Sequence, residues 1–101
     1  MNRLLSLLGL CARAGRIISG EKAVVNAVRT GAACCVLLDG AAAFNAEKAV
    51  SDACRFYDVP LIRTEENSLG EAIGKPGRMA AAVTDPGFAR SILKLSGDEN
   101  V

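Results

Sequence analysis

Apolar positions follow two different patterns along the chain. Between residues 2 and 14, leucines and one cysteine recur at the spacing of one helix face, and Gly15 follows as a stop. The run Cys34–Leu38 is instead apolar throughout, the pattern of a strand covered on both faces. The same two patterns, read over the whole chain, predict helices at 2–14, 20–31, about 46–57, 68–74 and 86–95, and strands at 16–18, 34–38, 60–63 and 79–83.

Polar residues stand where the predicted helices should begin. Ser19, Asn45 and Asp85 are expected to cap the second, third and last helices, and Ser68 with Glu71 matches a capping box before the fourth. In the third helix the residues expected to face inward are Ala49, Val50, Ala53 and Phe56.

Strand and helix alternate after residue 33, which predicts an α/β fold with helices on both faces of the sheet. Seventeen of the 101 residues are Ala and only four are aromatic, so the core should be packed from small side chains. We expect one domain at 1–95, with most of the aromatic rings buried, and a frayed tail at 96–101.

Composition excludes several chemistries. The chain has no His, which removes imidazole bases and His metal ligands. Its four cysteines show no C-x-x-C spacing, and we expect free, buried thiols in a reducing cytoplasm. The N-terminal apolar run is too short to span a bilayer, so no membrane partner is expected.

Charge is unequal between the two parts of the chain. Residues 1–38 carry five basic side chains and one acid, whereas residues 39–101 carry seven basic side chains and ten acids. This asymmetry favours a face on the first part that binds a polyanion.

The predicted start of the second helix concentrates this charge. Arg13, Arg16 and Lys22 flank it, and the unpaired N–H groups of a helix start can hold a phosphate. Gly20 has no Cβ to keep a nucleic-acid backbone away. Lys22 shares a helical face with Asn26 and Arg29. A solvated helix face with a simple Ser-Gly cap accounts for the composition equally well.

Two other stretches carry no chemistry. Residues 70–76 have three residues between their glycines where a phosphate-binding loop needs four, and Pro76 follows the Lys in place of Ser or Thr. Glu65 and Glu66 have no base or nucleophile beside them and read as solvated acids. We therefore expect no enzyme activity and no cofactor.

With these residues in place, the chain resembles the kink-turn-binding ribosomal protein family, and most closely its short bacterial members of the YlxQ type. The resemblance covers nearly the whole chain. It rests on Leu7–Gly15, Ser19–Glu21, Ala27–Gly31, Val36–Leu38, Tyr57–Pro60, Leu69–Gly74 and Ala82–Ala89.

The resemblance implies a three-layer α-β-α sandwich with a small mixed sheet. It also implies a non-catalytic protein that binds structured RNA, with ribosomal RNA or the ribosome as partner. We expect the protein to be a monomer. In the family, a Gly-x-Asn-Glu-x-x-Lys pattern at the start of the second helix contacts the kinked RNA. Here Gly20 is kept, while Lys22, Ala23 and Asn26 replace the family's Asn, Glu and Lys.

The predicted RNA-binding set combines the residues around the second helix with a loop that the resemblance implicates, Thr64–Asn67. It consists of Arg13, Arg16, Gly20, Glu21, Lys22, Asn26, Arg29, Thr64 and Glu65. The alternative is a protein-interaction module that kept the fold and lost the RNA site. An enzyme or small-molecule binder is the third hypothesis, for which the sequence nominates no pocket.

Overall fold

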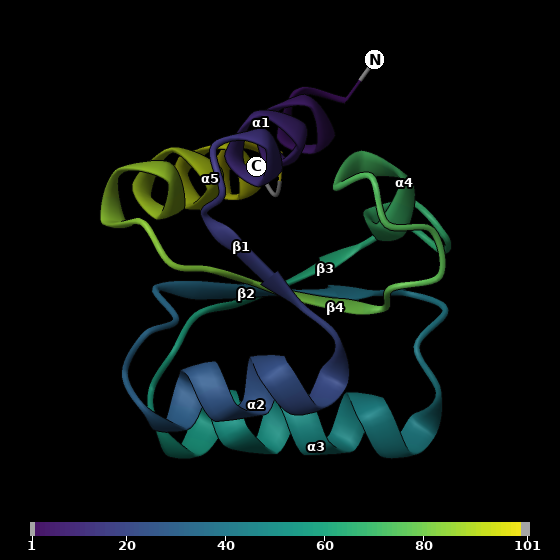
Figure 1. Cartoon of the computed structure of the whole chain (residues 1–101), viewed down its shortest axis with the longest axis vertical. Coiled ribbons are helices and arrows are strands. Elements are labelled where there is room, and N and C mark those ends of the chain that lie inside the picture. Colours follow the sequence, from purple (N-terminus) through teal and green to yellow (C-terminus); the bar gives the residue numbers. More distant parts are fainter. Residues whose placement is uncertain (1, 100–101) are drawn as a thin grey trace.

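Four strands form one sheet in the computed structural model, which describes residues 2–99, and helices pack on both faces of the sheet (Figure 1). Helices α2 and α3 cover one face, and α1, α4 and α5 lie on the other. In chain order the elements are α1 (Arg3–Arg13), β1 (Ile17–Ser19), α2 (Glu21–Arg29), β2 (Cys35–Asp39), α3 (Phe44–Phe56), β3 (Leu61–Thr64), α4 (Leu69–Ala72), β4 (Ala80–Val83) and α5 (Pro86–Glu99).

The sheet is mixed, with the strand order β1-β4-β2-β3. Strand β2 is parallel to β3, and β4 runs antiparallel to both of its neighbours. All five residues of β2 are buried, and four of them belong to the apolar run at 34–38 that predicted a strand here. The predicted α-β-α sandwich is confirmed.

Alternate residues of the strands divide the core into two clusters. Cys35 and Leu37 pack in the cluster beneath α1, α4 and α5, while Val36 and Leu38 pack in the cluster formed with α2 and α3. The alanines of β4 contribute to both clusters and are fully buried. Small side chains on this strand let the two helical layers lie close to the sheet.

Several predicted helix ends are wrong. Gly20 rather than Ser19 is the N-cap of α2, and Ala43 rather than Asn45 precedes α3. Helix α5 continues to Glu99, past the predicted end at Leu95; the rest of the predicted tail lies outside the described residues. The Asp85 cap is confirmed, since its Oδ2 accepts the Phe88 N–H at 2.8 Å.

The side chains along α3 also differ from expectation. Val50 and Cys54 are its buried residues, and Phe56 comes two positions after Cys54, which turns it about 200° around the helix. Phe56 is therefore 81% exposed, and the expectation of an inward ring was wrong. Phe44 and Tyr57 are exposed as well, so of the four aromatic rings only Phe88 packs against the core.

The four cysteines are free, and Cys11, Cys35 and Cys54 are buried. Burial raises the pKa of the Cys35 thiol to about 12 and that of Cys11 to about 11. These thiols are held protonated and act as small apolar side chains. Within residues 2–99, no helix is long and apolar enough to cross a membrane.

Candidate nucleic-acid interface

The chain turns from strand to helix at Gly20. Its N–H donates to the Ala80 carbonyl oxygen at 3.0 Å, which closes the pairing of β1 with β4. Its φ of +101° is a conformation that side chains with a Cβ rarely adopt, so glycine permits the abrupt start of α2. No side chain caps this helix. Unpaired N–H groups of its first turn therefore remain available to a ligand.

Arg78 lies against this turn, and the sequence prediction missed it. Its Nη1 donates to the Ser19 carbonyl oxygen at 3.0 Å, and a Cβ built on Gly20 would lie 2.7 Å from the same nitrogen. The side chain is exposed. Arg78 is distant from Gly20 in sequence, and only the antiparallel register of β1 with β4 brings the two together. A contact between residues so far apart in the sequence cannot be predicted from a local sequence pattern.

Helix α2 adds a second cation. Lys22 and Asn26 lie one turn apart, and both are exposed, as is the Ala23 methyl group. Glu21 lies in the first turn, where its negative charge interacts favourably with the helix dipole and reduces the local positive potential. We call the surface formed by Ser19–Lys22 and Arg78–Met79 the Gly20 edge.

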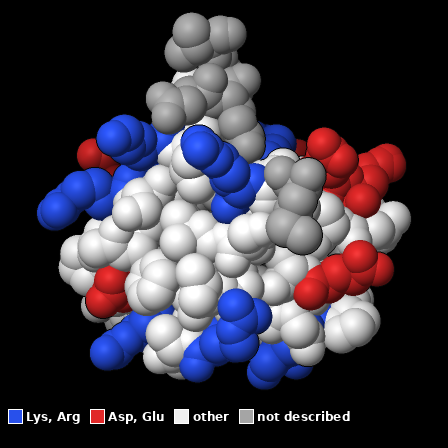
Figure 2. All heavy atoms as spheres, turned by 90° about the horizontal axis from the view of Figure 1, so that it is seen from above, with Lys and Arg blue, Asp and Glu red and all other residues white. Residues whose placement is uncertain are grey.

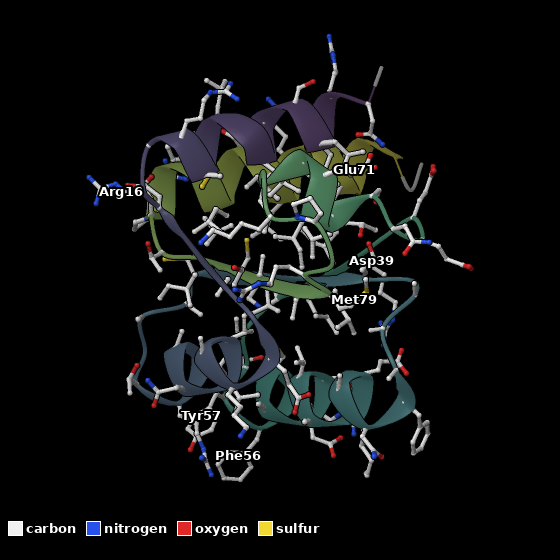
Figure 3. The ribbon with its side chains drawn as sticks, turned by 45° about the vertical axis from the view of Figure 1, so that its right-hand side comes forward. Arg16, Asp39, Phe56, Tyr57, Glu71 and Met79 are labelled. Carbon is white, nitrogen blue, oxygen red and sulfur yellow. The ribbon has the colours of Figure 1, made fainter. Side chains whose placement is uncertain are left out.

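Asp39 lies beyond Met79 on the same side of the sheet (Figure 3). Its N–H donates to the Met79 carbonyl oxygen at 2.8 Å. Its carboxylate is buried and accepts three backbone N–H groups, from Ala41 at 2.8 Å, Asn67 at 2.7 Å and Leu69 at 3.0 Å. Burial acts to raise the pKa of Asp39, but these donors outweigh it, and the pKa lies below its usual value. The group is structural.

The loop after β3 reaches this side of the sheet as well. Gly40 donates its N–H to the Thr64 carbonyl oxygen at 2.9 Å, so the end of β3 lies beside the end of β2. Three strand spacings separate β3 from β1, about 14 Å. Thr64 is buried, its hydroxyl oxygen included, so this side chain does not face the surface. Glu65 is exposed.

Three predicted arginines do not join the Gly20 edge. Arg16 lies at the opposite end of β1, where its carbonyl oxygen accepts the Thr84 N–H, about 13 Å from Gly20 along the strand (Figure 3). Arg13 lines a hollow between α1 and α4 that also contains Glu71. Arg29 ends α2. The prediction treated residues 13–22 as one cluster, but β1 is extended and carries its two ends apart.

The model of the ribosomal protein L7Ae/L30e/S12e/Gadd45 family matches residues 2–93. The chain belongs to this family. A relative from Bacillus subtilis (strain 168), named RNA-binding protein YlxQ, is 43% identical over 90 residues, which are 88% of this chain and 90% of the relative. A protein of the same name from Enterococcus faecium is 33% identical over 94 residues, covering 92% and 90%. The resemblance to YlxQ-type members is thereby confirmed.

Two solved structures have the same fold. A protein of unknown function from Bacillus halodurans C superimposes with a TM-score of 0.91 at 38% identity, over 96% of this chain and 99% of the other. The Giardia lamblia 15.5kD RNA binding protein superimposes with a TM-score of 0.76 at 22% identity, over 94% and 82%. The second likeness shows the fold alone.

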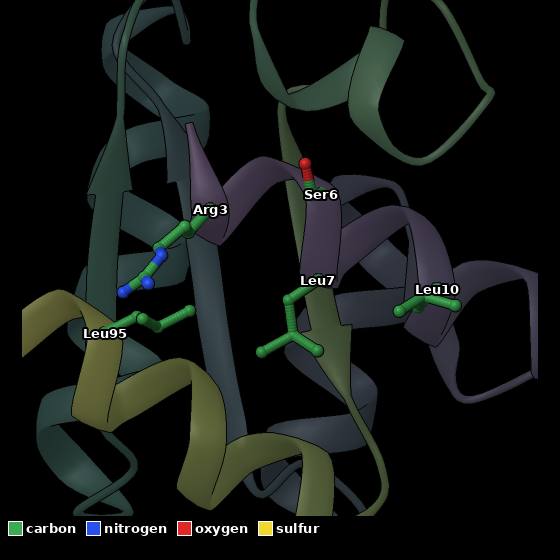
Figure 4. A pocket seen from close by; sticks show the side chains of 5 residues that line it. All are labelled: Arg3, Ser6, Leu7, Leu10 and Leu95. Carbon is green, nitrogen blue, oxygen red and sulfur yellow. The ribbon is translucent and has the colours of Figure 1, made fainter. Parts of the chain in front are cut away.

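The opposite helical layer has a different surface. Viewed onto α1 and α5, it has a largely uncharged centre with charged side chains around its margin (Figure 2). A hollow of about 490 Å³ opens there, lined mostly by Leu7, Leu10 and Leu95, with Arg3 as its one charged lining residue among the residues described (Figure 4). Aliphatic side chains offer phosphate groups no partner, so we leave this hollow out of the nucleic-acid interface.

Proposed function

We propose that this chain is a non-catalytic protein that binds structured RNA through the Gly20 edge. One observation carries the proposal: an uncapped helix start lies between two exposed cations, Lys22 and Arg78, in a chain whose family relatives are named RNA-binding proteins. Gly20 and Glu21 complete this surface, and Asn26 lies one helical turn beyond Lys22 on α2.

The proposed chemistry is chiefly electrostatic. A phosphate group at the start of α2 accepts hydrogen bonds from the free backbone N–H groups and is stabilised by the positive end of the helix dipole. Lys22 and Arg78 neutralise neighbouring phosphates, and the counterions they release make binding weaken as salt rises.

Base recognition rests on fewer groups. Ala23 has no carboxylate with which to accept a hydrogen bond from a base, and Asn26 and Lys22 are the polar side chains beside it. A lost bidentate contact removes about 1–3 kcal/mol of discrimination. We therefore propose recognition of backbone and shape in a folded RNA, with a modest preference for a kinked one.

The proposed setting is the cytoplasm, because four free thiols persist in a reducing compartment. Ribosomal RNA, and through it the ribosome, is the proposed partner, and the proposed binding unit is the monomer. Support comes from the family to which the chain belongs.

Titration against two RNAs tests this function. One is a kink-turn RNA, and the other is the same duplex with its G·A pairs replaced by Watson–Crick pairs, each at two salt concentrations. We expect both to bind with a steep salt dependence and the kinked RNA to bind more tightly. Absence of binding to either RNA contradicts the proposal and favours a protein-interaction module.

A further inference from the structure

Two aromatic rings stand exposed where α3 ends. Phe56 is 81% exposed and Tyr57 is 43% exposed. Their ring centroids lie 4.9 Å apart with the planes at 74°, an edge-to-face pair (Figure 3). Leaving a large ring in water forgoes the free energy of burying it, so a pair of exposed rings points to a ligand.

The pair borders a hollow of about 500 Å³ between α2 and α3. Val25 and Ala53 supply apolar lining, and Arg29 is the basic residue that lines it. The volume lies in the range of small-ligand pockets, which is large enough for a nucleobase.

The acidic side chain that lines the hollow pairs with other residues and not with Arg29. Its acidic lining residue, Asp52, is contacted by Lys48 at 3.1 Å and by Arg55 at 3.8 Å. Arg29 makes no ion pair with any residue in 2–97 and is exposed. An aromatic face beside an unpaired guanidinium is the combination on which unpaired RNA bases stack while a phosphate is neutralised.

One exposed side of α2 leads from the Gly20 edge to the hollow. Lys22, Asn26 and Arg29 follow one exposed side of α2, from its start to its end. Gly20 and Arg29 are nine residues apart, which is about 14 Å of helix. At roughly 3.4 Å per stacked nucleotide, about four nucleotides span this distance.

We propose that the hollow bordered by Phe56 and Tyr57 binds an unpaired base of the RNA held at the Gly20 edge. The base stacks on the Phe56–Tyr57 pair, and Arg29 contacts the adjoining phosphate. This inference rests on the proposed function and extends its footprint along α2. The unpaired Arg29 and its position on the same side of α2 as Lys22 favour RNA over a protein partner.

Tyr57 provides a direct readout, because it is the one tyrosine in a chain without tryptophan. The probes are a kink-turn RNA with an eight-uridine single-stranded extension, at either end, and the same RNA with an abasic extension. We expect the RNA with the uridine extension to quench Tyr57 fluorescence, and free tyrosine serves as the control for light absorbed by the RNA. We also expect this RNA to bind about tenfold more tightly than the RNA with the abasic extension. F56A should remove both effects. F44A is the matched control, because Phe44 is equally exposed on α3 but lies outside the hollow.

Anisotropy of the labelled RNA separates failure of this inference from failure of the proposed function. Equal binding of both extended RNAs, with Tyr57 fluorescence unchanged, overturns base stacking and leaves RNA binding intact. No binding of any RNA overturns both proposals. Self-association that F56A abolishes, with RNA affinity unaffected, would instead assign the rings to an interface between copies.

Discussion

Strands β1 and β2 end at the same edge of the sheet, but the backbone N–H groups near the two ends differ in their hydrogen-bond partners. At the end of β2, the buried Asp39 carboxylate accepts three backbone N–H groups from the segments that follow β2 and β3. At the end of β1, α2 begins at Gly20 with no side-chain cap and with exposed cations beside it. Only β4 lies between the two strands.

The difference separates a structural charge from a ligand-binding surface. A carboxylate whose oxygens are occupied by the chain itself has little capacity left for a ligand, however close to the interface it lies. A helix start left without a cap keeps its N–H groups for a partner. We therefore expect changes at Asp39 to alter stability and changes at the Gly20 edge to alter RNA binding.

The largest effect should follow D39N. The amide keeps the shape of the side chain, loses the charge and presents an NH₂ group to backbone donors. We expect the free energy of unfolding in urea to fall by about 3 kcal/mol. D52N is the control, because Asp52 is a half-exposed surface residue, and its effect should stay within about 0.5 kcal/mol. Equal effects of the two variants would contradict a structural role for Asp39.

Acid should weaken the same contacts in the wild type. The native pKa of Asp39 is below its value in the unfolded chain, so the carboxylate stabilises the fold at neutral pH. This contribution is complete above the unfolded pKa of about 3.9 and is lost as pH falls through the native value. Urea unfolding at a series of acidic pH values should therefore show a steeper loss for wild type than for D39N. Parallel curves would assign the acid sensitivity to other groups.

G20A should affect both properties. The Cβ meets the Arg78 guanidinium and the backbone is held at a positive φ, so we expect a loss of about 1–2 kcal/mol in stability. RNA affinity should fall too, because Arg78 must move. G31A carries a similar backbone strain with open space around the new methyl group. It should lose stability and keep RNA affinity, measured by anisotropy, and a matching loss of affinity in G31A would refute the role of Gly20.

R78A should have only a small effect on stability. Its exposed side chain makes one hydrogen bond, to Ser19, so unfolding should change by about 0.5 kcal/mol. RNA binding should weaken on the order of fivefold, and the slope of log affinity against log salt should decrease by about one. R90A, on an exposed position of α5, is the control. An unchanged slope in R78A would remove Arg78 from the interface.

Local patterns predicted most of the fold and one of the two segments of the Gly20 edge, but not the Arg78–Met79 segment. The apolar run of β2 and the Asp85 cap were recognisable because strand burial and capping depend on adjacent residues. Strand order is set by pairing between distant segments, and this pairing brings Arg78 to Gly20.

Two errors share that cause. Ser68 is the N-cap residue of α4, as predicted, but its side chain makes no capping hydrogen bond, and the Leu69 N–H at the start of the helix is donated to Asp39, thirty positions away. The hydroxyl of Ser68 donates to the Glu65 carbonyl oxygen instead. Likewise, Arg16 is near Gly20 in sequence and distant in space, because β1 is extended. Adjacency in the chain was mistaken for adjacency in the fold.

One pair of charge reversals tests the central claim most directly. K22E changes the Gly20 edge, and K94E makes the same change at an exposed position of α5 on the other layer. Glu at position 22 favours the start of a helix, so stability should be kept. Titrated with the kink-turn RNA, K22E should bind at least about tenfold more weakly with a lower salt slope, and K94E should stay within about twofold of wild type. Equal losses in both variants, or none in K22E, would contradict RNA binding at the Gly20 edge.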